Sequence, residues 1–297
     1  MKMIKRKIKN YIRDFIRVLL TREQYIRYRF YFTHKYRLNL KKPKTWNEKI
    51  QYRKLFGDHK LYAEYIDKYS VRKKIKEILG EKYLIPLIAK YDKITVEDIE
   101  NLPSSFVIKT SNGGGGENVR IIREKEKINK EKLCKEFNRY LKIKIGEKID
   151  EPYYDFNKAS IIVENLILDS ENQIPNDYKF HCFRDEERMK IIIQVDAGRF
   201  KKHRRNFYDE EWKILGLKIA KKGIDYEVKK PQNLEEMLIC VDKISKIFDY
   251  SRIDMYNVDG KIYFGEITFA HGSGYEKLPY DWDLKMGELW NLKYNPS

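Results

Sequence analysis

The chain of 297 residues has few of the features that mark secreted, membrane-spanning or metal-cluster proteins. Its three cysteines, Cys134, Cys182 and Cys240, are far apart and odd in number, so they predict neither a disulfide framework nor a metal site and suit a reducing compartment. No apolar run is long enough for a signal peptide or a bilayer span. The chain has no internal repeat. We therefore expect a cytoplasmic protein.

Positive charge is concentrated at one end. Of a net charge of +17, residues 1–44 carry +13, with 15 lysine and arginine residues against two acidic ones. The other 253 residues carry only +4. A body this close to neutral argues against a nucleic-acid partner, because such partners need a basic surface over the binding domain.

Residues 1–44 are expected to form a basic amphipathic helical arm. Apolar residues recur at helical spacing from Ile4 to Leu20, and lysines and arginines occupy the other faces. Two interpretations remain open. In the first, residues 1–20 would lie on an anionic membrane surface, and the protein would be peripheral on the inner face of the cell membrane. Alternatively, their apolar face packs against the body of the protein.

The body is predicted to be α+β. Residues 45–105 form a helical N-terminal region, opened by a capping box of Thr45 and Glu48, interrupted at Gly57-Asp58 and ended by Gly80. Residues 106–297 are rich in short strands, with helices at about 126–145 and 233–248. The expected strands are 106–109, 119–122, 161–164, 178–183, 189–195, 253–257 and 262–267.

A run of four glycines follows the first of these strands. The strand Phe106–Lys109 ends in a lysine, and Gly113, Gly114, Gly115 and Gly116 come shortly after it. Glycine lets a backbone approach a ligand closely and turn its N–H groups inward, and Lys109 would add a fixed positive charge. This pattern indicates phosphate binding, although a glycine run alone also describes a flexible hairpin.

Two acidic residues are predicted to meet on adjacent strands. Asp254 and Glu266 flank an Asp259-Gly260 hairpin turn, and counting back from the turn brings them close in register. Such carboxylates suit Mg²⁺, and Arg252 faces the same way as Asp254 because it lies two residues earlier. Cross-strand pairing with lysine or arginine is the alternative interpretation.

Two further segments complete an ordered set. The strand Ile161–Glu164 ends in an acid followed by Asn165 and Leu166, and the strand Asp177–Phe180 carries Lys179. In this order the segments resemble those of the ATP-grasp superfamily. Their amino-acid sequences are similar to those of the TupA-like ATP-grasp family, found among teichuronopeptide and capsule or O-antigen synthesis proteins. The matching segments are 43–51, 67–72, 102–109, 177–180, 208–212 and 263–269, within about residues 43–290.

The resemblance implies an ATP-grasp fold in which two β-rich lobes, about 106–165 and about 166–297, clamp ATP. Lys109 and Lys179 would contact phosphates, Gly113–Gly116 would close over them, and Glu164, Asn165 and Leu166 would hold the adenine. Asp254 and Glu266 would bind Mg²⁺. Thr268 stands where the broader superfamily has Asn, and its hydroxyl is the weaker ligand, which leaves the number of metal ions open. Arg252, with Lys179, would serve catalysis by neutralising the transferring phosphoryl group.

The expected activity is that of an ATP- and Mg²⁺-dependent carboxylate–amine ligase working through an acyl phosphate. By resemblance, it would attach an amino acid to a uronic acid or acidic polymer in surface-polysaccharide synthesis. The basic segment 199–205 would seat that polymer or be a solvated loop, and His271 would act as a base or be polar packing. A glycosyltransferase of the same pathways and a nucleotide-binding protein without turnover are the alternatives.

Overall fold

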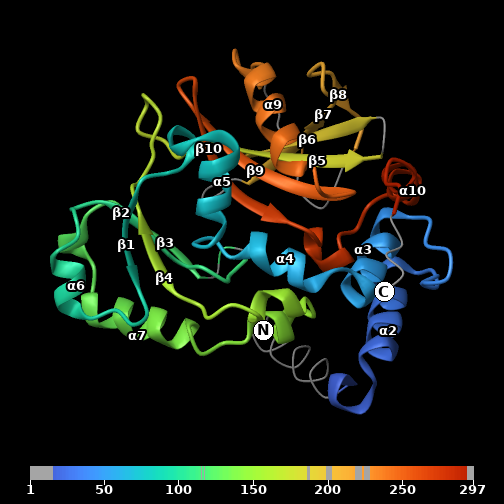
Figure 1. The fold of residues 1–297 in the computed structure, drawn as a ribbon, viewed down its shortest axis with the longest axis horizontal. Helices are drawn as coiled ribbons and strands as arrows, with labels where there is room; N and C mark the ends of the chain where they lie inside the picture. Colours follow the sequence, from blue (N-terminus) through green and yellow to red (C-terminus); the bar gives the residue numbers. More distant parts are fainter. Residues whose placement is uncertain are drawn as a thin grey trace.

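The computed structural model describes residues 16–114, 116, 118–185, 188–198, 203–217, 223 and 228–292 (Figure 1). Within these residues the chain forms two antiparallel sheets and a set of surrounding helices. The principal helices are α2 (Arg22–His34), α3 (Trp46–Phe56), α4 (His59–Ile66), α5 (Val71–Leu79), α6 (Val96–Glu100), α7 (Lys130–Tyr140), α8 (Ile145–Ile149), α9 (Leu234–Ser245) and α10 (Tyr280–Glu288).

The smaller sheet has four strands in the order β1-β4-β2-β3. These are β1 (Leu87–Tyr91), β2 (Phe106–Thr110), β3 (Val119–Ile122) and β4 (Ile161–Glu164). Alternate residues of β2 point to opposite faces. Phe106 and Ile108 are fully buried in a core shared with Phe137 of α7, whereas Val107 and Lys109 line a cavity on the other face. The edge strand β1 precedes residue 106 in the chain and pairs with β4.

The larger sheet has six strands in the order β10-β9-β5-β6-β7-β8. These are β5 (Asp177–Arg184), β6 (Met189–Ala197), β7 (Arg204–Tyr208), β8 (Ile214–Leu215), β9 (Tyr250–Val258) and β10 (Lys261–Thr268). One face is apolar and packs in a core that includes residues of α4, α5 and α9. On β5 and β9 this face presents Phe180 and Ile253, and the alternate positions Lys179 and Asp254 face the other way. The opposite face therefore collects the polar side chains of the sheet.

A bulge in the β9–β10 hairpin sets the face on which Glu266 lies. The two-residue turn Asp259-Gly260 has positive φ values of 50° and 86°, and it pairs Val258 with Lys261. Uninterrupted pairing from this turn would place Asp254 opposite Gly265 and turn Glu266 to the other face. The register shifts between Phe264 and Glu266, so Glu266 pairs directly with Asp254. The predicted meeting of the two carboxylates is confirmed.

The expected strands and helix signals are largely confirmed. All seven predicted strands are present, Thr45 and Glu48 form a reciprocal capping box, and Gly80 ends α5. One prediction is wrong. Arg204 and Arg205 belong to β7 rather than to a basic loop. Residues 199–202 of that segment lie outside the described residues.

The described part of the N-terminal arm packs against the body. Helix α2 starts at a Thr21 capping box and buries Tyr25, Ile26 and Phe30, of which Ile26 and Phe30 form a small cluster with Leu38 and Leu40. Residues 1–15, which hold most of the predicted amphipathic helix, lie outside the described residues. No helix within the described ranges is long and apolar enough to cross a membrane.

Candidate active site between the two sheets

Two adjoining cavities share Gly114, Asn118 and Glu266 in their walls. The first is lined by the smaller sheet, the glycine loop, the segment after β4, and Asp254 of the larger sheet. The second is lined largely by the polar face of the larger sheet and the turn after β10. Residues predicted to bind the nucleotide line the first cavity: Lys109, Gly113, Gly114, Gly116, Glu164, Asn165 and Leu166. Gly115 lies outside the described residues. Lys179, Arg252 and Thr268 line the second cavity.

Glu164 is held by two cations in the wall of the first cavity. Lys109 Nζ lies 2.6 Å from one carboxylate oxygen and Arg72 Nη1 lies 3.0 Å from the other. Arg72 Nη2 also donates to the carbonyl of Ile85 at 2.7 Å. The negative charge of Glu164 is therefore balanced by Arg72 and Lys109, and the ion pair orients the Lys109 side chain. Arg72, from α5, was not predicted as a site residue, although it lies in a segment that carried the family resemblance.

The glycine loop is tied to both sheets. Lys68 Nζ donates to the carbonyl of Gly113 and lies 3.4 Å from Glu266 Oε2. The buried amide of Asn118 donates to Thr110 Oγ1, and a Cβ atom on Gly113 would lie 1.5 Å from Asn118 Nδ2. The loop therefore requires glycine at position 113 for the close approach of Asn118.

Replacing Gly113 by alanine is expected to weaken ATP binding about tenfold. The new methyl group displaces the Asn118 amide, and losing its hydrogen bond costs roughly 1.4 kcal/mol. At Gly114 a Cβ atom would lie 3.6 Å from the Tyr154 hydroxyl, an ordinary contact, so Gly114→Ala should have a smaller effect. Calorimetric titration with ATP compares the two variants. Equal affinities for both would contradict the assigned packing of the loop.

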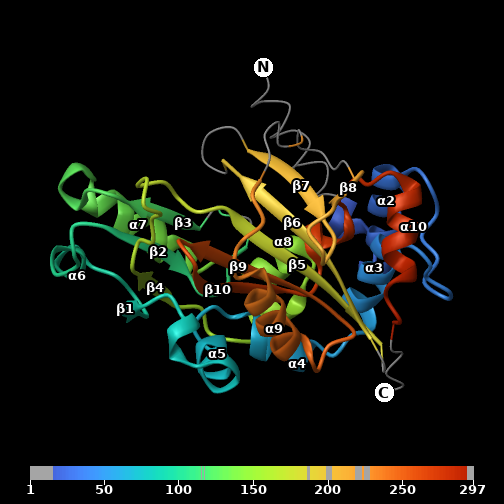
Figure 2. The ribbon, with the colours of Figure 1, turned by 90° about the horizontal axis from the view of Figure 1, so that it is seen from above.

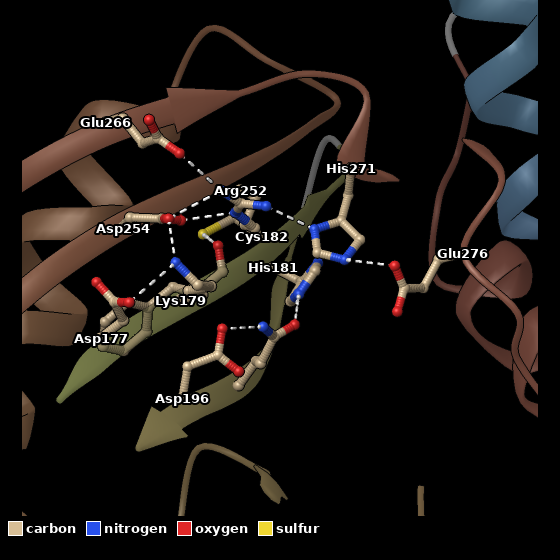
Figure 3. A network of polar contacts seen from close by, with 12 residues as sticks. Asp177, Lys179, His181, Cys182, Asp196, Arg252, Asp254, Glu266, His271 and Glu276 are labelled. Carbon is tan, nitrogen blue, oxygen red and sulfur yellow. Dashed lines mark hydrogen bonds and ion pairs between the residues drawn. The ribbon is translucent and has the colours of Figure 1, made fainter. Parts of the chain in front are cut away.

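Arg252 and Lys179 surround the Asp254 carboxylate (Figure 3). Arg252 Nε lies 2.6 Å from Asp254 Oδ1 and Nη2 lies 2.8 Å from Oδ2. Lys179 Nζ lies 2.5 Å from Oδ2, and Arg252 Nη2 reaches Glu266 Oε1 at 3.0 Å. Burial alone would lower the pKa of Arg252, but Asp254 and Glu266 outweigh it and raise the pKa. The guanidinium therefore stays charged and joins the two carboxylates.

The carboxylate pair suits a hard divalent cation. Glu266 keeps about 28% of its side chain exposed where the two cavities meet, and Asp254 pairs with it across the hairpin. Within the described residues no group of three or more His, Cys, Asp or Glu side chains is gathered for a metal. Two carboxylates completed by water and substrate phosphates are the usual protein contribution to an Mg²⁺ site. Thr268 pairs with Arg252 and lies on the side of the second cavity.

The comparisons with known proteins fit this geometry. The model of the TupA-like ATP-grasp family matches residues 48–291. The chain belongs to the TupA-like ATP-grasp family. The predicted α+β ATP-grasp fold is thereby confirmed. A search of the curated proteins finds no match.

Solved ATP-grasp enzymes are among the similar structures. An ADP complex of N5-carboxyaminoimidazole ribonucleotide synthetase is 13% identical, with a TM-score of 0.44, over 70% of this chain and 45% of that one. The D-alanine–D-alanine ligase of Helicobacter pylori is 14% identical, with a TM-score of 0.44, over 75% and 60%. The phosphoribosylamine–glycine ligase of Thermotoga maritima is 13% identical, with a TM-score of 0.40, over 70% and 48%. The chain spans about half of the length of these proteins.

The contacts of His271 do not suit a general base. Its Nδ1 lies 2.6 Å from Arg252 Nη1, and a guanidinium can only donate, so Nδ1 accepts and Nε2 carries the proton. Burial and the neighbouring Arg252 charge hold the pKa of His271 well below its ordinary value. The ring also stacks on Trp46 at 5.4 Å between centroids. His271 therefore stays neutral and helps to orient Arg252, which favours polar packing, the second of the two roles that the sequence left open.

The far wall of the second cavity carries a buried ion pair that the sequence did not reveal. Arg205 Nε lies 2.5 Å from Asp196 Oδ1 and Nη2 lies 3.2 Å from Oδ2. Burial raises the pKa of Asp196, but the hydrogen bonds and charge of Arg205 prevail and lower it to about 2. Arg205 also lies 3.4 Å from Glu276. No local pattern marks Asp196, because its partner is brought to it by the β6–β7 pairing.

His181, beneath the site, is expected to make stability dependent on pH. Its Nε2 lies 3.2 Å from Gln194 Oε1 and its Nδ1 lies 3.0 Å from the Tyr250 hydroxyl. Burial lowers its pKa from 6.5 to about 3, so between these values the unfolded chain binds a proton that the folded chain does not. The contribution of His181 to stability is complete above pH 6.5 and is lost as the pH falls toward 3.

Denaturation between pH 7 and pH 4 measures this effect. His181 should contribute a slope of up to about 1.4 kcal/mol per pH unit to the free energy of unfolding. The variant His181→Gln lacks the titrating ring, so its curve should be flatter than that of the native chain. Parallel curves would show that His181 is not the titrating group.

Proposed function

We propose that this TupA-like ATP-grasp protein is an ATP- and Mg²⁺-dependent ligase that joins a carboxylate to an amine. The observation that carries the proposal is the place of Glu266 in the walls of both cavities, with Asp254 paired to it in the wall of the first. A phosphoryl group held there would have the proposed nucleotide site on one side and the side chains of Arg252 and Lys179 on the other. The solved structures support the fold alone, and the activity rests on this geometry.

The first cavity supplies the groups for ATP. Gly113, Gly114 and Gly116 line this cavity, where their backbone would approach the phosphates, and Lys109, oriented by Glu164, would add a positive charge. Asn165 and Leu166 line the same cavity, where peptide groups would hydrogen-bond to the edge of the adenine. Lys68 contacts both the carbonyl of Gly113 and the Glu266 carboxylate, so a movement of the glycine loop would also move the contact with Glu266.

The second cavity supplies the groups for the acceptor carboxylate. Arg252 and Lys179 are buried, charged and directed to the junction, where they neutralise negative charge on a transferring phosphoryl group. The acceptor carboxylate oxygen forms a bond to the γ-phosphorus as the bond to the ADP oxygen breaks. The amine then attacks the carbonyl carbon of the acyl phosphate, and inorganic phosphate leaves while the nitrogen loses a proton. Mg²⁺ bound by Asp254 and Glu266 would neutralise phosphate charge.

The proposed substrates are an amino acid and a uronic acid or acidic polymer of surface-polysaccharide synthesis. Support comes from the cations Lys148, Lys179, Arg205 and Arg252 in the lining of the second cavity, where they stand beside the acids Glu151, Asp196 and Glu266. An acceptor with several carboxylates would meet positive charge on more than one wall. The setting in capsule, O-antigen or teichuronopeptide synthesis follows from the family resemblance of the sequence segments.

The test is Mg²⁺-dependent ADP release from ATP with a panel of amino acids, each with and without uronic-acid oligosaccharides. The proposal expects release only when a carboxylate and an amine are both present, together with a new amide product. Consumption of a nucleotide sugar without ADP release would instead indicate a glycosyltransferase. ATP binding without release across the panel would favour a nucleotide-binding protein without turnover.

A further inference from the structure

Helix α2 exposes aromatic side chains on the face that points away from the body. Tyr28, Tyr31 and Phe32 are 40%, 48% and 55% exposed, and Val18 and Leu19, just before the helix, are 86% and 65% exposed. These five are among only twelve exposed large hydrophobic side chains in the described residues. We call Tyr28, Tyr31 and Phe32 the aromatic face of α2. A cluster of this kind on a protein surface marks an interaction site.

The aromatic face is not the side by which α2 packs against the body. The opposite side of α2 is already packed, with Ile26 and Phe30 fully buried beside Leu38 and Leu40. Polar contacts also fix the helix, because Arg22 Nε lies 2.7 Å from Asp150 Oδ1 and the Arg29 guanidinium lies 3.7 Å from the centroid of the Tyr275 ring. The helix therefore presents Tyr28, Tyr31 and Phe32 outward while it stays docked.

The segment that carries this face is almost entirely positive in charge. Residues 16–44 contain nine lysines and arginines and one acid, Glu23, which pairs with Arg27 at 2.8 Å. Lys35 lies 5.7 Å from the centroid of the Phe32 ring, and Arg37, Lys41, Lys42 and Lys44 are exposed in the following segment. Figure 2 shows α2 and α10 at the same end of the molecule, as Figure 1 does, and Tyr280 of α10 is 57% exposed and lies 5.2 Å from the Tyr36 ring.

We propose that the aromatic face of α2 and the basic residues beside it bind the surface of an anionic lipid bilayer. Tyrosine and phenylalanine insert at the level of the lipid headgroups, and lysine and arginine attract anionic headgroups. A second copy of the chain is a poorer occupant, because pairing α2 with itself would bring two strongly positive surfaces together. This surface lies in residues 22–44, beyond the segment 1–20 for which the sequence suggested membrane contact, and it is independent of the ligase proposal.

Co-sedimentation of the full chain with lipid vesicles tests the proposal. We expect binding to phosphatidylcholine vesicles that contain phosphatidylglycerol, little binding to pure phosphatidylcholine, and weakening by salt. The double variant Tyr28→Gln/Phe32→Gln should lower the affinity at least about tenfold, since two inserting rings are removed. The matched control Ile239→Gln/Ile247→Gln, which removes side chains 50% and 55% exposed elsewhere, should bind as the native chain does.

A second variant separates lipid binding from any effect on folding. Lys41→Glu/Lys42→Glu changes only exposed side chains and should also lower anionic-vesicle affinity at least about tenfold. Unchanged binding by both double variants, equal binding to neutral vesicles, or no binding at all would overturn the proposal. A native dimer that Tyr28→Gln/Phe32→Gln converts to a monomer in sedimentation velocity would overturn it in favour of self-association.

Discussion

Glu266→Gln is expected to lower ADP formation at saturating ATP by about 10²–10³-fold. The substitution keeps the shape of the side chain and removes the negative charge that faces both cavities. Arg252 then loses one of its two carboxylate partners, and the pair with Asp254 can no longer offer two anionic ligands to Mg²⁺. Steady-state ADP release measures the loss.

The control is Glu235→Gln, an exposed acid at the start of α9. It should behave as the native chain, and thermal denaturation should show that Glu266→Gln keeps the fold, because Glu266 is only partly buried. A folded Glu266→Gln protein with ADP formation within about threefold of the native rate would remove Glu266 from the chemistry, because loss of such a charge costs far more.

Arg53→Met is expected to lower the free energy of unfolding by about 3–5 kcal/mol. Arg53 is 2% exposed and joins α3 to the strand that carries Arg252. Its Nη1 donates to the Tyr250 carbonyl at 2.7 Å, its Nη2 pairs with Asp249, and its guanidinium lies 4.3 Å from the centroid of the Trp290 ring. Methionine fills a similar volume but leaves the buried carboxylate and the carbonyl without this donor.

Urea denaturation compares Arg53→Met with Lys60→Met, which removes an exposed charge from α4 and should cost under about 0.5 kcal/mol. The double variant Arg53→Met/Asp249→Asn should recover part of the loss, because the unpaired charge is then absent. A loss below about 1 kcal/mol for Arg53→Met would mean that the buried ion pair contributes little beyond packing.

Local patterns predict the parts of this fold whose cause is local. The Thr45 capping box, the Gly80 helix end and the Asp259-Gly260 turn each follow from hydrogen bonds or φ values within a few residues. The hairpin count also brought Asp254 and Glu266 together. The direct pairing of Glu266 with Asp254 depends on the bulge between Phe264 and Glu266, which no residue pattern predicts. A one-residue difference in register there decides on which face of the sheet Glu266 lies.

The residues that sequence reasoning missed come from distant segments. Lys68 and Arg72 belong to the helical region, yet they reach the glycine loop and Glu164. Asp196 depends on the neighbouring β7 strand, whose first two residues, Arg204 and Arg205, lie in the segment that the sequence predicts to be a loop. The residue type of His271 left a base and polar packing open, and only the contact with Arg252 fixes its tautomer. Partners that lie far apart in sequence have no local signature.

Transfer of ¹⁸O from the acceptor carboxylate to inorganic phosphate tests the central claim most directly. The measurement uses the carboxylate–amine pair that supports ADP release, with ¹⁸O in the carboxylate, and follows phosphate by mass spectrometry. If the carboxylate attacks the γ-phosphorus and the amine then displaces phosphate, each phosphate released carries one labelled oxygen. Unlabelled phosphate would mean that water, and not the carboxylate, receives the phosphoryl group, and would contradict the ligase mechanism.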